Sequence, residues 1–152
     1  MISPAGGQVA ALQSALAAEN AAIYSYGIVG AHLAGALATQ AGLDWTAHQR
    51  ARDQLTSLIL AAGGRPVPAA VAYQLPLQVG GQAQAITLAV YLERQAIAAY
   101  LALAAAPETR LRQLAATSMQ ACAVRAAHWN GQSQPFPGLP VSALQPSSQG
   151  PA

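Results

Sequence analysis

The sequence predicts a single all-α domain, a four-helix bundle in which two antiparallel hairpins are joined by a long crossover. Three observations support this prediction. Apolar residues recur at helical spacing in four segments of the chain. The chain is alanine-rich, and alanine has the highest helix propensity of all residues. Prolines and glycine pairs interrupt the pattern at residues 63–81 and again after residue 130.

The first hairpin is predicted from residues 8–41 and 44–62. In the first segment, apolar residues step alternately by four and by three, which places them on one face of a helix. We expect Gly42 to end this helix and Asp44 to cap the start of the next. The glycine pair at 63–64 then ends the second helix.

The second hairpin is predicted from residues 82–105 and 107–129, with Pro107 in the first turn of the last helix. Short links join the helices within each hairpin and make them antiparallel neighbours. The link at residues 63–81 can reach ~60 Å when extended, longer than a helix of ~33 Å. The bundle is therefore expected over residues 1–130, followed by an extended tail rich in proline, glycine and serine over 131–152.

The composition and charge of the chain argue against several classes of function. Only 8% of the residues are charged, and the seven basic residues are scattered arginines, which argues against nucleic acid as a partner. The most apolar stretch, residues 83–106, carries Glu93 and Arg94 at its centre, which disfavours a membrane span. The first seven residues lack the pattern of a signal peptide, so we expect a cytoplasmic protein. A surface this poor in charge predicts a homo-oligomer, most simply a dimer.

Two glutamates interrupt the apolar stripes of the first and third predicted helices. Glu19 lies between Leu16 and Ile23, and Glu93 lies between Val90 and Ile97. Both carboxylates are therefore predicted inside the bundle, where each needs a cation or hydrogen-bond donors. The predicted buried polar cluster comprises Glu19, Arg52, Glu93, Arg125 and His128. The segments 19–23 and 93–97 also echo each other, as a duplicated hairpin would.

Several segments together resemble a known family. They are residues 17–27 and 48–53, Glu93 with Tyr100, residues 125–129, and the Phe-Pro-Gly-Leu-Pro run at 136–140. These segments are similar to ferritin-like proteins, and more narrowly to a bacterial ferritin-like domain family of unknown function. The resemblance implies a ferritin-like fold with a di-iron site built from one Glu on helices one and three and a Glu-x-x-His pair on helices two and four.

The ligand set that this resemblance implies is largely lost here. Glu19 and Glu93 match the single carboxylates, and His128 matches the last histidine. Arg125 stands where the Glu before that histidine is expected, and the second helix has no Glu-x-x-His. The family resemblance and these departures together predict no cofactor.

Three functional hypotheses remain. The first is a non-catalytic, metal-free structural or interaction module that self-associates, since the sequence shows neither a nucleophile with an adjacent base nor a phosphate loop. The alternative is a degenerate metal-binding protein that holds iron or manganese through Glu19, Glu93, His128 and His48. The third is a small apolar ligand held between the helices.

Overall fold

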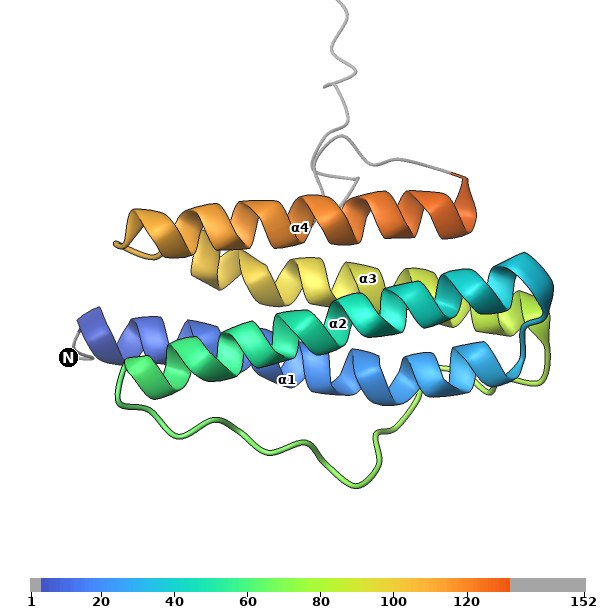
Figure 1. Cartoon of the computed structure of the whole chain (residues 1–152), viewed down its shortest axis with the longest axis horizontal. Coiled ribbons are helices and arrows are strands. Elements are labelled where there is room, and N and C mark those ends of the chain that lie inside the picture. The colour runs from blue at the N-terminus through green and yellow to red at the C-terminus, as the bar shows by residue number, and fades with distance from the viewer. Residues whose placement is uncertain (1–3, 132–152) are drawn as a thin grey trace, which may run out of the picture.

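The computed structural model describes residues 4–131, which form four helices and no strands. They are α1 (Pro4–Ala31), α2 (Gly35–Ala61), α3 (Gln82–Ala104) and α4 (Thr109–Asn130). Figure 1 shows α1 and α2 as one antiparallel hairpin and α3 and α4 as a second. The predicted all-α class and the four helices are confirmed. The predicted tail lies outside the described residues from position 132 onward.

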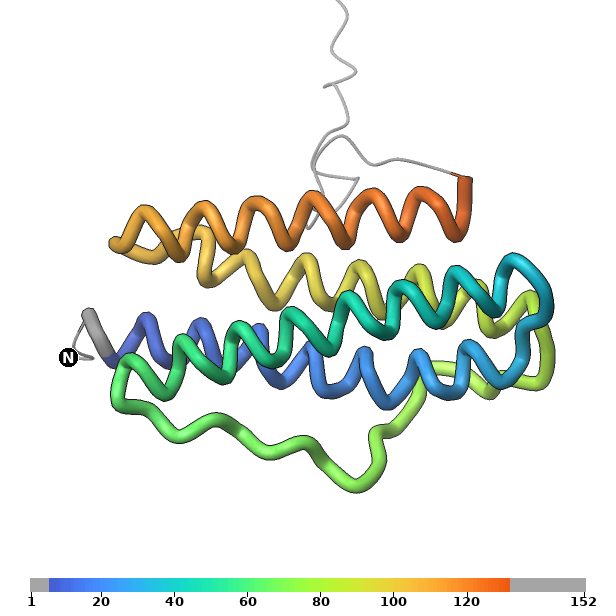
Figure 2. Tube along the Cα trace, viewed as in Figure 1, coloured from blue at the N-terminus to red at the C-terminus, as the bar shows by residue number. Residues whose placement is uncertain are grey.

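The two hairpins are joined by a crossover segment, residues 62–81, that contains no helix. Figure 2 traces this segment along the length of the bundle, from the end of α2 to the opposite end, where α3 begins. Its prolines account for the absence of helix, because proline lacks the backbone donor that a helix requires. The crossover makes α2 and α3 run in the same direction.

The predicted boundary between the first two helices is wrong. α1 ends at Ala31 and α2 begins at Gly35, so Gly42 lies within α2. Gly35 has a φ of 57°, a left-handed conformation that favours glycine, and it allows the chain to reverse here. Leu33 and Leu37 continue the helical spacing across this turn, which is why the apolar pattern did not reveal it. Asp44 is correspondingly a buried residue of α2 and not a cap.

Besides a small cluster of Ala96, Ile97 and Cys122, the core consists of two large apolar clusters along the bundle axis. One is built on Leu12, Leu16, Leu55, Ile59 and Leu103, and the other on Tyr26, Val29, Leu88, Leu92 and Trp129. Glu19, His48 and Glu93 are buried as well, with exposed fractions of 1%, 0% and 0%. In chain order these polar residues separate the apolar residues of the two clusters on α1, α2 and α3. The bundle therefore has a charged layer between two apolar halves.

Helix packing leaves one side of the bundle open. α1 packs against α2 and α3, and α3 packs against α4. α2 and α4 instead face each other across a groove lined by residues of both helices. Polar side chains such as Arg50, Gln54 and Thr117 lie on the facing sides, so closing the groove would bury groups without partners.

By length and composition α3 alone among the described helices could cross a membrane. Half of its most apolar window is buried inside the bundle, and Glu93 is fully buried at its middle. These are the properties of the central helix of a bundle.

Candidate functional site

His48 lies at the centre of the charged layer, between the two glutamates. Its Nδ1 is 2.5 Å from Glu19 Oε2, and its Nε2 is 3.0 Å from Glu93 Oε1. Glu19 comes from α1, His48 from α2 and Glu93 from α3. One imidazole therefore bridges two carboxylates and joins three helices.

Two tyrosines complete the hydrogen bonding of the glutamates in a reciprocal way. Tyr26 of α1 donates to Glu93 Oε1 at 2.6 Å, and Tyr100 of α3 donates to Glu19 Oε1 at 2.8 Å. Each tyrosine follows the glutamate of its own helix by seven residues and binds the glutamate of the other helix. This exchange extends the sequence echo between α1 and α3 and supports an origin by duplication of a hairpin.

Arg125 supplies the second cation of the layer. Its Nε donates to Glu93 Oε1 at 3.0 Å, and its Nη2 lies 3.2 Å from Cys122 Sγ. The side chain is 18% exposed, so the guanidinium reaches the layer from the edge of the groove. Glu93 Oε1 thus accepts three hydrogen bonds, while Glu93 Oε2 is buried without a partner among the described residues.

The sequence did not reveal an extension of the layer through Asp44 and Trp129. Trp129 Nε1 donates to Asp44 Oδ2 at 2.8 Å and to the Tyr26 hydroxyl at 3.1 Å. Gln40 donates to the other Asp44 oxygen at 2.8 Å. One feature of the sequence could have indicated this extension: Asp44 and His48 are four residues apart, which places both on one face of a helix.

The electrostatics favour a charge-neutral network. Burial alone would lower the pKa of His48, but the hydrogen bonds and charges of Glu19 and Glu93 outweigh it and raise the pKa to about 9. Burial likewise opposes ionisation of Glu93, yet His48 and Arg125 hold the pKa of its carboxyl below the usual range. At neutral pH two cations, His48 and Arg125, therefore face two anions, Glu19 and Glu93.

The phenols of Tyr26 and Tyr100 and the thiol of Cys122 stay neutral at this pH. Burial, reinforced by the adjacent glutamates, raises the pKa of both Tyr26 and Tyr100 above the ordinary value. Burial also raises the pKa of the Cys122 thiol, although Arg125 opposes the shift. A protonated, buried thiol and two protonated phenols are poor nucleophiles and poor bases.

Of the residues predicted for the buried cluster, the structure brings together Glu19, Glu93 and Arg125 but neither Arg52 nor His128. The Arg52 side chain is 35% exposed and binds Asp53 at 2.8 Å. His128 is exposed on α4. The buried face of α4 runs through Leu111, Ala115, Cys122, Ala126 and Trp129. The inward face predicted for α4 was displaced by one residue along the sequence, which corresponds to a rotation of about 100° around the helix axis. Alanines occupy both faces of this helix, so the apolar pattern did not define its buried face.

The donor set of the layer does not fit a metal ion. Both ring nitrogens of His48 are within hydrogen-bond distance of carboxylates, and an imidazole protonated on both nitrogens has no lone pair to offer a cation. Arg125 occupies the approach to Glu93 with a fixed positive charge. Among the described residues, no group of three or more His, Cys, Asp or Glu side chains is arranged to hold a metal ion.

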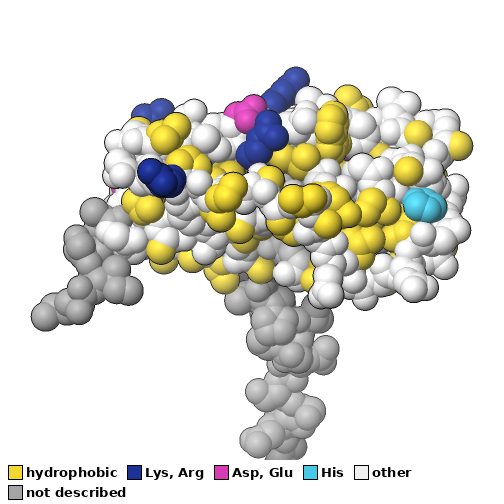
Figure 3. Space-filling model, turned by 90° about the horizontal axis from the view of Figure 1, so that it is seen from below, with side chains coloured by type: hydrophobic (Ala, Val, Ile, Leu, Met, Phe, Trp, Pro, Cys, Tyr) yellow, Lys and Arg dark blue, Asp and Glu magenta, His cyan; other side chains and the backbone are white. Residues whose placement is uncertain are grey.

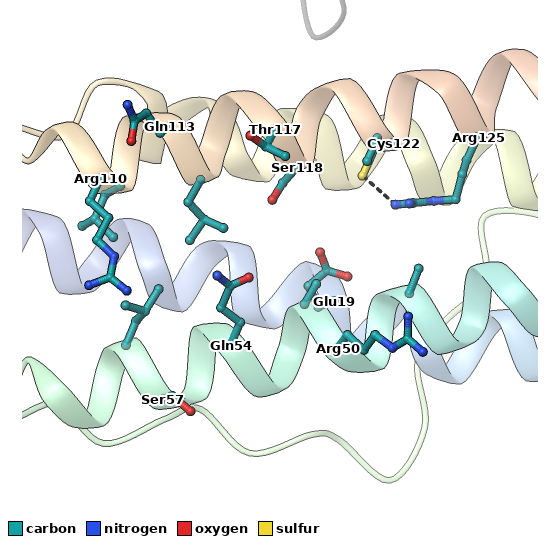
Figure 4. A pocket seen from close by; sticks show the side chains of 16 residues that line it. Glu19, Arg50, Gln54, Ser57, Arg110, Gln113, Thr117, Ser118, Cys122 and Arg125 are labelled. Atoms are coloured by element: carbon teal, nitrogen blue, oxygen red, sulfur yellow. Dashed lines mark hydrogen bonds between the residues drawn. The ribbon is translucent and has the colours of Figure 1, made fainter.

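The α2–α4 groove opens beside the charged layer and has a volume of about 680 Å³. Glu19 and Cys122 lie at its base, and Arg125 lies at its edge. Figure 4 shows Arg110 reaching from α4 toward α2 at one end, and Arg50 of α2 facing Arg125 of α4 near the other. Gln54, Thr117 and Ser118 lie between these ends.

Comparisons with known proteins give a matching family and a similar solved structure. The sequence model of a family described as "Domain of unknown function (DUF4439)" matches residues 11–141. The crystal structure of a conserved hypothetical protein, Rv2844, from Mycobacterium tuberculosis is similar, with 36% sequence identity and a TM-score of 0.79. The similarity covers 82% of this chain and 96% of that one. A search of curated proteins finds no match.

Proposed function

The chain belongs to the DUF4439 family, and we propose that it is a non-catalytic, metal-free module of ferritin-like architecture that acts through binding. One observation carries the proposal: at the interior positions that resemble a di-iron site, both ring nitrogens of His48 lie within hydrogen-bond distance of a glutamate carboxylate, with Nδ1 close to Glu19 and Nε2 close to Glu93. The positive charge that balances Glu19 and Glu93 is thus supplied by the protein itself, through His48 and Arg125.

The ferritin-like part of the proposal rests on the arrangement of the helices. Two antiparallel hairpins are joined by a crossover along the bundle, and α1 and α3 each contribute one buried glutamate near mid-bundle. That connectivity and those two carboxylates are features of ferritin-like bundles. The non-catalytic part rests on the protonated thiol and phenols of the layer. The prediction that the protein is cytoplasmic stays a prediction.

Metal analysis tests the metal-free proposal. Protein purified without chelator is expected to contain less than about a tenth of an equivalent of iron, manganese or zinc, and reconstitution should not change this, because a metal would have to displace protonated His48. Elemental analysis gives the content. Arg125→Ala provides the sharper comparison, since removing the competing cation should raise metal uptake only if the layer is a degenerate metal site. A stoichiometric metal in the parent protein would refute the proposal.

Self-association is the mode of binding that we propose first, with a dimer as the simplest state. The crossover face, defined by Tyr24, Val71, Tyr73 and Tyr91, is apolar: Tyr24 and Tyr91 are 36% and 39% exposed, and Val71 is fully exposed. Tyr73 contacts Tyr24 with ring centroids 5.5 Å apart and borders a hollow between α1 and α3 with Tyr91. Figure 3 views the crossover side and shows hydrophobic side chains gathered along it. Such patches commonly mark interfaces.

Sedimentation tests this assignment. The parent protein is expected to be a dimer at micromolar concentration, and the double variant Tyr24→Glu/Tyr91→Glu is expected to be a monomer, because two buried carboxylates would oppose association. Val124→Glu is the matched control, since Val124 is 63% exposed on α4, the helix on the far side from the crossover. A monomeric parent, or a dimer disrupted only by Val124→Glu, would overturn the proposed interface.

A further inference from the structure

We propose that the α2–α4 groove is a binding site for an anionic amphiphile, a ligand with a carboxylate or phosphate head and an apolar chain. This site is separate from the crossover face and does not depend on self-association. The inference rests on the charge of the groove, on the absence of an internal counter-anion and on the apolar residues along the groove.

The groove carries positive charge that the protein does not neutralise. Within the charged layer, His48 and Arg125 balance Glu19 and Glu93. Arg50 and Arg110 also line the groove, and neither forms an ion pair with any residue of the described chain. Both are exposed. Glu19 is the only acidic residue among the lining side chains. The groove therefore has an excess of two positive charges and would attract an anion.

The chain itself offers few anions for this purpose. It has five acidic side chains, of which Glu19, Asp44 and Glu93 are buried. Asp53 is paired with Arg52, and Glu108 accepts a hydrogen bond from Gln8. Among the residues that the structure describes, a second copy would therefore present Glu108 alone as an exposed carboxylate without a cationic partner. Residues 132–152 contain no Asp or Glu. Charge complementarity thus favours a separate anionic molecule over a segment of this chain.

The space between the arginines suits an apolar chain. Its lining includes Leu58 of α2 with Leu111 and Leu114 of α4, together with Ala47, Ala51 and Ala121. Arg110 and Arg125 are fifteen residues apart on one helix, a separation of ~22 Å along the axis. The volume of about 680 Å³ is within the usual range for small-molecule sites. An elongated ligand could therefore place its head against an arginine and its chain along the leucines.

Calorimetric titration of the full chain tests the site with four ten-carbon probes, each below its micelle concentration and at low salt. Decanoate and decyl phosphate are the anionic probes, while decanol and decylamine are the neutral and cationic ones. At least one anionic probe is expected to bind with a 1:1 stoichiometry per chain and more tightly than decanol or decylamine. Comparison of the two anionic probes identifies the preferred head group.

Variants localise the binding. The double variant Arg50→Gln/Arg110→Gln should lower the affinity for the anionic probe by about tenfold or more, because charge-assisted hydrogen bonds would be lost. Arg65→Gln/Arg94→Gln removes the same charge from exposed positions outside the groove and should change the affinity by less than about twofold. Thr117→Trp should block the groove from an exposed position. Failure of both anionic probes to bind, or equal losses in the two double variants, would overturn the proposal.

Discussion

Replacing His48 by leucine is expected to lower the free energy of unfolding at pH 7 by about 3 to 5 kcal/mol. Among the described residues, His48 is the one side chain that hydrogen-bonds to both Glu19 and Glu93. Both glutamates stay buried after the substitution, since they are only 1% and 0% exposed. Leucine is close to histidine in size, so the loss comes from uncompensated charge rather than from a cavity. Denaturant unfolding of the parent and variant measures the difference.

Two comparisons separate this effect from a general loss of packing. His128→Leu changes an exposed histidine of α4 and should stay within about 0.5 kcal/mol of the parent. The deficit of His48→Leu should also shrink toward acid pH, because protonation of the stranded Glu93 removes its charge. Equal stability of His48→Leu and the parent at pH 7 would mean that His48 does not balance the two carboxylates.

Replacing Arg125 by alanine is expected to cost about 3 kcal/mol, at the lower end of the range for breaking a buried ion pair. Its side chain is 18% exposed and its Nε lies 3.0 Å from Glu93 Oε1. Glu93 keeps two donors after this change, His48 and Tyr26, so the loss should be smaller than for His48→Leu. Thermal and denaturant unfolding in the presence of chelator give the value.

Arg52→Ala is the matched control for the loss of an arginine. Arg52 is 35% exposed and its partner Asp53 is 68% exposed, and surface pairs of this kind contribute less than about 1 kcal/mol. The deficit of Arg125→Ala should be the same with and without chelator. A variant that melts within about a degree of the parent would show that Arg125 does not stabilise Glu93.

The sequence predicted much of the fold because the helices carry long apolar stripes and the crossover carries its prolines. It failed at the first turn, where Leu33 and Leu37 keep the helical period and one glycine, Gly35, reverses the chain. A single glycine with positive φ leaves no periodic signal, whereas the more conspicuous Gly42 lies inside α2. The misplaced turn also led to the incorrect assignment of Asp44 as a helix cap.

For the charged layer, the sequence identified the anions better than the cations. Glu19 and Glu93 interrupt strong apolar stripes, so their burial could be inferred from residues on the same helix. Their partners depend on the rotation and depth of α2 and α4, which the alanine-rich sequence leaves poorly defined. His48, and not the predicted Arg52, pairs with Glu19 and Glu93, and His128 is exposed. Long side chains such as Arg52 can also reach solvent from the edge of a buried stripe.

The protonation state of His48 determines how the layer responds to pH. Its pKa is raised from 6.5 to about 9 in the folded protein. A raised pKa means that the folded state binds the proton more tightly, so the contribution of His48 to stability is complete below about pH 6.5. That contribution is lost as the pH rises through about 9. The parent protein should therefore become less stable across this interval, and His48→Leu should not show this loss.

Nitrogen NMR of the His48 ring, recorded with chelator present and titrated from pH 6 to pH 10, tests the central claim most directly. The neutral, metal-free layer predicts an imidazolium with protons on both Nδ1 and Nε2 at pH 7, titrating near pH 9. A singly protonated ring at pH 7, or a ring whose signals change when metal is removed, would contradict it.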